Sequence, residues 1–271
     1  MLLRILLVVF GVAVSFALSK NAALAEPLSY KQLQVIDGLF YRKGTNELIT
    51  GDVSWRKKNW FPGTVREGRV KDGKKVGVWL WIEEGKVFSK ENYVDGKKDG
   101  PKVHFYEDGS ISMLMGYKNG KQHGEDKMFY PDGAIEHKDN YVNGKREGLS
   151  FSYYRSGKVK TKHSYKNGKT EGKAYWYYRN GKLKHTEIYR GGKVDGEAIE
   201  FGLDGTIIEK YFYVNGKQEG DLIVYRNDGS LERIDRYSQG ERNGIQEVYG
   251  RDGKLLYREE YKMGKQLRLL N

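Results

Sequence analysis

The sequence has no cysteine and few aliphatic side chains, and both absences restrict its class. Without cysteine, the chain can form neither a disulfide bond nor an anchor through a lipid-modified cysteine. With 35 glycines, 21 tyrosines and 31% charged residues, it cannot build a thick aliphatic core. No apolar stripe with the 3.6-residue spacing of a helix is long enough to predict one. Stability must therefore come from aromatic packing and from pairing of extended backbone.

What the sequence does have is a repeat. Residues 141–148 read Tyr-Val-Asn-Gly-Lys-Arg-Glu-Gly, and residues 117–124, 165–172 and 213–220 follow the same pattern. The first glycine of the motif recurs every 24 residues, at Gly96, Gly120, Gly144, Gly168, Gly192, Gly216, Gly240 and Gly264. A second glycine series keeps the same period half a unit away, at Gly85, Gly109, Gly133, Gly157, Gly181, Gly205, Gly229 and Gly253. So regular a repeat predicts an array of identical structural units.

Each unit reads as two strands. An aromatic side chain stands in a fixed position at Trp81, Phe105, Phe129, Tyr153, Tyr177, Phe201, Tyr225 and Tyr249. Apolar residues often lie two positions earlier, as they do on one face of a strand, at Val103, Phe151, Tyr175, Ile199 and Ile223. The second glycine series closes two-residue Asp-Gly or Asn-Gly turns of the tight hairpin type. The Asn-Gly-Lys-x-x-Gly motif is interpreted as a longer turn into the next unit.

These patterns predict an all-β fold, an elongated open array in which 24-residue β-hairpins form a meander. A closed barrel would also remove edge strands, but about sixteen strands would enclose a wide lumen, and no packed interior or lipid-facing band is visible. A propeller needs four strands per blade and a longer unit. The tandem units are assigned to residues 73–271, and residues 26–72 are interpreted as a degenerate repeat that caps the N-terminal end.

The first 25 residues differ from the rest. Arg4 precedes an apolar run over residues 5–18, and Ala23-Leu24-Ala25 places small residues before Glu26. This is the layout of a cleaved signal peptide, and about 14 apolar residues are too few for a membrane anchor. Loss of Arg4 and Lys20 would lower the formal net charge from +12 to +10. The expected location is therefore periplasmic or extracellular, with no integral membrane segment left after cleavage.

The unit Tyr-x-Asn-Gly-Lys-x-x-Gly resembles the MORN repeat, and its spacing to a mid-unit Asp-Gly resembles the bacterial variant of that family. The resemblance covers residues 38–264 and departs from the pattern at the first unit, at residues 239–244 and at residues 263–265. It implies a single layer of β-hairpins that serves as a scaffold for proteins or anionic lipids. Some bacterial relatives are described as antitoxins of toxin–antitoxin systems.

Candidate binding residues fall into two groups. Each motif turn carries a lysine, which predicts a row of positive charge along one edge, the turn-lysine ladder of Lys97, Lys121, Lys145, Lys169, Lys193 and Lys217. Lys121, Lys145 and Lys169 are its central members. The second group is a basic-aromatic patch that occurs once, Arg56, Lys57, Lys58 and Trp60. An acid follows two residues after most ladder lysines, and we expect the two rows to neutralise each other.

No catalytic, cofactor or metal site is predicted. The chain has no Gly-x-Ser-x-Gly or Gly-x-x-x-x-Gly-Lys motif and no cysteine–histidine nucleophile pair. Of the five histidines, His137 and His185 share a position in the unit but stand two units apart, roughly 19 Å by strand spacing. That separation is too long for a shared metal. Carboxylates that recur in every unit belong to the fold of the unit rather than to a glycosidase site, and an exported chain is not expected to bind nucleic acid.

The sequence thus predicts a non-enzymatic, exported scaffold that binds a protein partner. Two alternatives stay open: an antitoxin or immunity protein that occludes a toxin, and attachment to an anionic envelope lipid or polymer. The preference for a protein rests on the acids, because they would cancel much of the field of the turn-lysine ladder.

Overall fold

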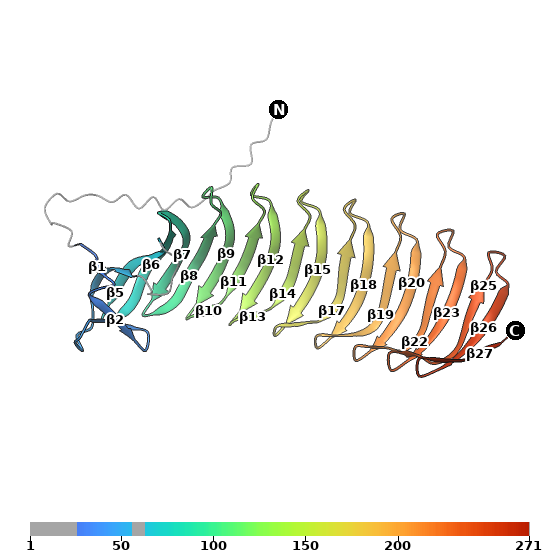
Figure 1. Ribbon diagram of the computed structural model, residues 1–271. Helices are drawn as coiled ribbons and strands as arrows, with labels where there is room; N and C mark the ends of the chain where they lie inside the picture. Colours follow the sequence, from blue (N-terminus) through green and yellow to red (C-terminus); the bar gives the residue numbers. More distant parts are fainter. Residues whose placement is uncertain (1–25, 56–62, 271) are drawn as a thin grey trace, which may run out of the picture.

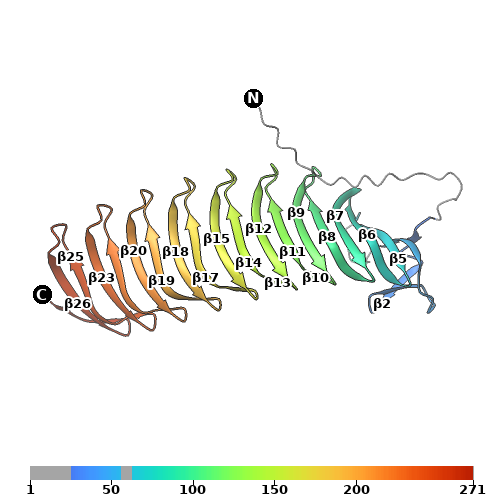
Figure 2. The same ribbon diagram turned by 180° about the vertical axis from the view of Figure 1, so that it is seen from behind.

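The fold is an open sheet of β-hairpins stacked side by side into a long, bowed ribbon (Figures 1 and 2). The computed structural model describes residues 26–55 and 63–270. Within these residues all regular elements are strands, so no helix there is long and apolar enough to cross a membrane. The predicted all-β open array is confirmed. The predicted signal segment, residues 1–25, lies outside the described residues.

The N-terminal part and the first three regular strands have these bounds: β1 (Leu28–Ser29), β2 (Leu33–Ile36), β3 (Leu39–Arg42), β4 (Gly51–Trp55), β5 (Val65–Lys71), β6 (Lys74–Glu83), β7 (Lys86–Val94) and β8 (Lys97–Phe105). The central units comprise β9 (Ile111–Lys118), β10 (Lys121–Gln122), β11 (Gly124–Phe129), β12 (Ile135–Val142), β13 (Lys145–Arg146), β14 (Gly148–Tyr153), β15 (Val159–Lys166), β16 (Lys169–Thr170), β17 (Gly172–Tyr177) and β18 (Leu183–Arg190). The last units comprise β19 (Lys193–Phe201), β20 (Ile207–Val214), β21 (Lys217–Gln218), β22 (Gly220–Tyr225), β23 (Leu231–Ser238), β24 (Glu241–Arg242), β25 (Gly244–Tyr249), β26 (Leu255–Lys262) and β27 (Lys265–Leu270).

From β4 to β27 the sheet is an antiparallel meander. The two-residue strands β10, β13, β16, β21 and β24 each pair with the same preceding strand as the longer segment that follows them. β1 adds a parallel strand beside β4, and β2 and β3 form a separate hairpin. Register shifts near both ends of the hairpins, such as those at Ser152/Tyr153 and Glu187/Tyr189, are β-bulges. Bulges increase local twist and bend strands. They account for the bowed hairpins.

The two kinds of turn are the reverse of the sequence prediction. In the Asn-Gly-Lys motif, Val142 pairs with Lys145 across only two residues, and Asn143 and Gly144 have φ of 52° and 83°. Two positive φ values define the type I′ turn, which matches the twist of a hairpin. The predicted longer turn is therefore the tight one.

The Asp-Gly turn is wider than predicted by one residue. The Tyr130 amide donates to the Ala134 carbonyl, leaving three residues in the loop, and only Gly133 among them has positive φ. Asp132 instead accepts a hydrogen bond from the Ala134 amide at 3.1 Å, as an Asx turn does. Asp at this position serves as an acceptor and does not adopt a left-handed conformation.

One residue of the predicted aromatic series is out of register. Trp81 pairs with Ser89, whereas Phe105 pairs with Ile111, and the true counterpart of Phe105 is Ile82, which pairs with Val87. The reason is the two-residue turn between β6 and β7, one residue shorter than in the later units. Placing Trp81 with the other aromatics was therefore wrong.

A hydrophobic core exists only at the N-terminal end of the described chain. It consists of Leu33, Phe40, Ile49, Val53, Val70, Trp79 and Tyr93. Over the rest of the described residues, the buried hydrophobic side chains are Met115, Ala174 and Ala198. The repeats are a single layer, and each hairpin is stabilised mainly by backbone pairing with its neighbours. The segment interpreted as a cap, residues 26–72, supplies five of the core side chains.

The tight turns give a direct test of this fold. A valine at Gly144 must adopt a φ near 83°, which a β-branched side chain strongly disfavours. We expect Gly144→Val to lower the free energy of unfolding by about 1–3 kcal/mol in urea titrations. Gly144→Asn is the control and should cost clearly less, because asparagine tolerates a left-handed backbone. Equal stability of the two variants would contradict the turn assignment.

Candidate functional site

The turn-lysine ladder lies on one edge of the sheet, as predicted. Lys121, Lys145 and Lys169 are exposed, and each begins a short strand directly after a type I′ turn. The stem of each lysine lies beside the glycine of the next turn: a Cβ added at Gly168 would be 3.7 Å from the Lys145 Cβ. The turns are also joined by backbone bonds, such as the Gly168 amide donating to the Arg146 carbonyl at 2.9 Å. The structure therefore aligns the three lysines in one row.

The acids of this edge bind backbone amides and, in the described chain, make no contact ion pair with the ladder lysines. Glu147 accepts a hydrogen bond from the Asn167 amide at 2.8 Å, one turn further along the chain. Glu171 and Glu219 make the same bond to the amides of Gly191 and Gln239. Within the described residues, no ion pair shorter than 4.0 Å joins these acids to the turn-lysine ladder. The carboxylates are held by the next turn's backbone on the same edge as the lysines, and the expected neutralisation stays a prediction.

The basic-aromatic patch of Arg56, Lys57, Lys58 and Trp60 lies outside the described residues. It remains a prediction. Its flanks are strand β4, which ends at Trp55, and the segment that starts at Gly63 and leads into β5.

A series of tyrosines that sequence reasoning missed joins the units at the opposite edge. The Tyr154 hydroxyl donates to the Tyr177 carbonyl at 2.6 Å, 23 residues ahead. Tyr106, Tyr130 and Tyr178 make equivalent bonds, and in a later unit Arg226 reaches the Tyr249 carbonyl instead. The 24-residue spacing of these tyrosines was the available signal. Each bond connects one hairpin to the next, so the series is structural.

The two faces of the sheet differ in chemistry. We define the outer-face strip as eight half-buried apolar and aromatic side chains of strands β14, β17, β19 and β22, namely Phe151, Tyr153, Tyr175, Tyr177, Ile199, Phe201, Ile223 and Tyr225. Rings two apart on a strand stack, as in Tyr175–Tyr177 with centroids 6.4 Å apart. Lys162 places its ammonium 5.7 Å from the Tyr175 ring centroid. Among the described residues, no second layer covers this strip.

The inner face, which holds Asp139, Ser150, Ala174 and Asp235 among its buried residues, carries paired charges. Arg146 donates to the Tyr141 hydroxyl at 3.0 Å and to the Tyr165 hydroxyl at 3.3 Å, and its guanidinium lies 3.5 Å from Asp139. The hydrogen bond from Arg146 to Tyr141 is the main cause that raises the pKa of Arg146. This charge is fixed in place.

His185 is held between two carboxylates on the same face. Its Nε2 lies 3.1 Å from Glu187 and its Nδ1 lies 2.8 Å from Glu200. Burial opposes the charged form, but the two glutamates outweigh it and raise the pKa of His185. Tyr189 donates to the other oxygen of Glu187 at 2.5 Å. Within the described residues, no cluster of three or more histidine and carboxylate side chains has the arrangement of a metal site.

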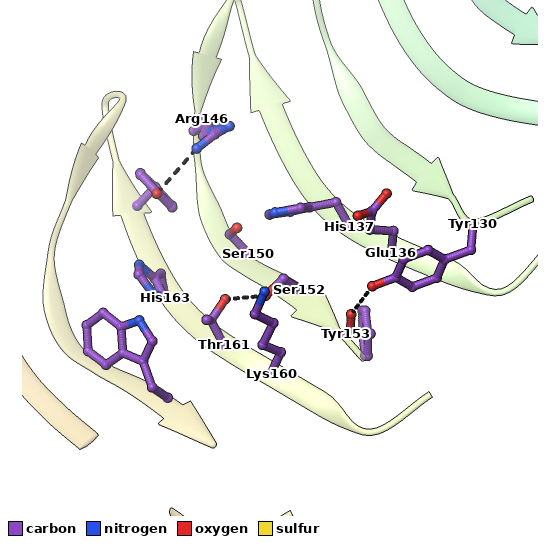
Figure 3. Close-up of a pocket in the computed structure, with 12 residues that line it drawn as sticks. Tyr130, Glu136, His137, Arg146, Ser150, Ser152, Tyr153, Lys160, Thr161 and His163 are labelled. Carbon is purple, nitrogen blue, oxygen red and sulfur yellow. Dashed lines mark hydrogen bonds between the residues drawn. The ribbon is translucent and has the colours of Figure 1, made fainter. Parts of the chain in front are cut away.

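The inner face is hollowed into a cavity of about 330 Å³ (Figure 3), and Arg146 and Trp176 are among its lining residues. His137, Ser150, Ser152, Thr161 and His163 lie around it, from strands β12, β14 and β15. Burial lowers the pKa of His163, which is therefore neutral near pH 7. Sequence reasoning missed this cavity, because its lining residues have no motif spacing and depend on which face each strand presents.

Comparison with known proteins supports the repeat assignment. The family model described as a MORN repeat variant matches residues 122–143, 146–167, 170–190 and 242–263. These segments make up less than half of the chain, yet the hairpins between residues 191 and 241 follow the same strand pattern. No curated protein matches the chain.

Among solved structures, the chain is similar over 85% of its length to 14% of a chain in the Photorhabdus luminescens Tc holotoxin pore. The identity is 9% and the TM-score is 0.14, too low to support an argument. The family match is therefore the informative comparison. Four segments of this chain are similar to the MORN repeat variant, and the structure places them as hairpins of one repeat scaffold, the first three consecutive and the fourth nearer the C-terminus.

Proposed function

We propose that the chain is a non-catalytic, exported scaffold that binds a protein partner along the outer-face strip. The observation that carries this proposal is the strip itself: half-buried aromatic and aliphatic side chains on a single-layer sheet, uncovered within the described chain. Protein interfaces concentrate their binding energy in a few such aromatic anchors. A repeated unit places them at regular intervals, which suits an elongated partner.

The lysines near the strip fit the same proposal. The Lys162 and Lys173 ammonium groups both lie over the Tyr175 ring, 5.7 Å and 6.0 Å from its centroid. These ammonium groups cover part of the aromatic surface in the free protein. A partner carboxylate could pair with them while the rings make apolar contacts. An antitoxin would be one case of such a scaffold, with a toxin as the partner.

One observation favours a second candidate, attachment to an anionic lipid or polymer. The turn-lysine ladder is exposed, aligned and free of ion pairs with the neighbouring acids. Such a row binds anions weakly per site and in a salt-dependent manner. The two candidates use different parts of the molecule, the edge and the outer face, and are therefore separable by mutation.

The test is capture of a protein partner from envelope extract by three variants. We expect Tyr175→Ala combined with Phe151→Ala to weaken capture tenfold or more, since loss of central aromatic anchors costs about 2 kcal/mol or more. Tyr257→Ala, an exposed tyrosine on the other face, is the matched control. Charge reversal of Lys121, Lys145 and Lys169 to glutamate should change capture little. If that reversal abolishes capture, and the bound material is a polyanion released by salt, the second candidate replaces the first.

A further inference from the structure

The inner face is filled at both ends of the array and hollow in its middle. On β6, the position facing Glu91 holds Trp79. The equivalent position on β14, facing His163, holds Ser150, and on β25, facing Glu259, it holds Gln246. Small side chains continue beside Ser150, at Ser152 and at Ala174 on the next hairpin. Large side chains are missing from this row at Ser150 and, on the next two hairpins, at Ala174 and Ala198, and the cavity lies beside Ser150.

The cavity is lined mostly by hydroxyl and imidazole groups, which take part in hydrogen bonds. Ser150 and Thr161 contribute hydroxyls, and His137 and His163 contribute imidazoles. Nδ1 of His137 and Nε2 of His163 have almost no exposed surface and no hydrogen-bond partner within the described chain, so the contacts to a ligand would come from the other lining groups. A neutral imidazole carries one donor and one acceptor. A ligand rich in hydroxyl or amide groups can pair with both hydrogen-bond donors and acceptors, whereas an anion can only accept hydrogen bonds.

The charges at the cavity largely cancel. Arg146 is balanced by Asp139 at 3.5 Å, and the lining holds one further cation, Lys160, and one acid, Glu136. Figure 3 shows Arg146 at one end of the cavity and Lys160 and Glu136 toward the other. A site with this balance does not favour a strongly charged ligand of either sign.

An aromatic wall completes the site. Trp176 lines the cavity and is fixed between His163 and His185, with ring centroids 4.9 Å and 5.0 Å away. The face of an indole ring is electron-rich and attracts the weakly positive C–H groups of a sugar ring. At about 330 Å³ the cavity is near the lower end of ligand pockets, roughly 300–1,000 Å³, so it admits a small ligand of one or two rings.

We propose that this cavity binds an uncharged saccharide, one or two rings of a glycan, with Trp176 under the ring and the serine, threonine and histidine groups around its hydroxyls. The proposal concerns the inner face of the sheet and shares only Tyr153 with the outer-face strip. It assigns the scaffold a second ligand class, so that a protein partner and a glycan could be held at the same time.

The experiment is a titration of the full chain, labelled with ¹⁵N, with N,N′-diacetylchitobiose, an uncharged disaccharide with acetamido groups. We expect saturable shifts of the Trp176 indole N–H and of amides in β14 and β15, unchanged by 0.5 M NaCl. Trp176→Phe assigns the indole signal. Ser150→Phe should fill the cavity and weaken binding about tenfold or more. Ser164→Phe, on the outer face of the same hairpin, is the matched control and should bind as the natural chain does.

Three results would overturn the proposal. One is the absence of a shift at Trp176 up to high millimolar disaccharide. Another is a response to inorganic phosphate alone that disappears with salt, which would indicate an anion site around Arg146 and Lys160. The third is a set of shifts that map to the outer-face strip. Because the shift map of the unmutated chain decides each case, misfolding of Ser150→Phe would not obscure the answer.

Discussion

Trp79→Ala should lower the free energy of unfolding by about 3–5 kcal/mol, the range for removing a large aromatic side chain from a packed core. Trp79 is 2% exposed and packs against Phe40 and Tyr93, with ring centroids 5.6 Å and 6.2 Å away. Its Nε1 donates to the Arg69 carbonyl at 3.1 Å. Gly68 leaves room for the indole, since a Cβ there would lie 2.4 Å from the ring. No other repeat has an equivalent cluster in the described residues.

Urea titration followed by circular dichroism measures the effect, and Trp176→Ala is the matched control. Trp176 lies in the single-layer part of the sheet, where it is only partly buried, so its removal should cost much less. Because units of an array touch only their neighbours, the transition of Trp79→Ala should broaden, with the N-terminal end unfolding first. Similar losses for the two variants would show that the core at β6 does not stabilise the array more than the repeats do.

The fold was predictable because the repeat restricts it so strongly. The spacing of Gly120, Gly144 and Gly168 defines the unit, and the alternation in segments such as residues 149–153 defines the strands. Turn geometry was less predictable. Asn-Gly and Asp-Gly both favour tight turns, and what separates them is the Asx hydrogen bond at Asp132, which fixes a three-residue loop. Spacing alone does not show where a hydrogen bond forms.

The candidate sites were only partly predictable for a related reason. A repeated residue such as Lys145 can be placed on an edge from its spacing, and the structure confirms that edge. The role of Glu147 could not be derived, because its partner, the Asn167 amide, belongs to the next turn. The inner-face cavity depends on residues that differ between units, such as Ser150 where β6 has Trp79 and β25 has Gln246. Comparing the units for shared residues does not reveal positions at which one unit differs from the others.

Positions that recur in the repeat and positions that differ in one unit have different roles along the array. Residues that recur from unit to unit, such as Gly144 in every repeat and Tyr154 in four of them, form turns and join neighbouring hairpins. Residues specific to one place, such as Trp79 and Ser150, produce the core at one end and the cavity in the middle. We therefore expect function to follow the irregular positions, while substitutions at regular positions act mainly through stability.

Stability of the N-terminal end should also depend on pH through Glu91. This side chain is 7% exposed and accepts hydrogen bonds from the Tyr93 hydroxyl at 2.6 Å, from Lys98 at 2.9 Å and from Lys102 at 3.0 Å. Burial favours the neutral acid, but these three partners outweigh it and lower the pKa of Glu91 from 4.5 to about 2. The unfolded chain therefore binds a proton more readily than the folded one between these values.

This difference in proton binding decides how stability changes with pH. The contribution of Glu91 is fully present above pH 4.5 and is lost as the pH falls toward 2, and it amounts to about 2–3 kcal/mol. We expect Glu91→Gln to be less stable than the natural chain at pH 7 by about this amount, and to lose less stability between pH 5 and pH 3. Urea midpoints at pH 7, 5 and 3 measure the stability of both proteins.

Glu125→Gln is the matched control. Glu125 also contacts two lysines, Lys127 and Lys138, but it is 48% exposed, so it should contribute about 1 kcal/mol or less. If the two variants show the same pH dependence, then the burial of Glu91 adds nothing to the effect of its lysine partners on stability.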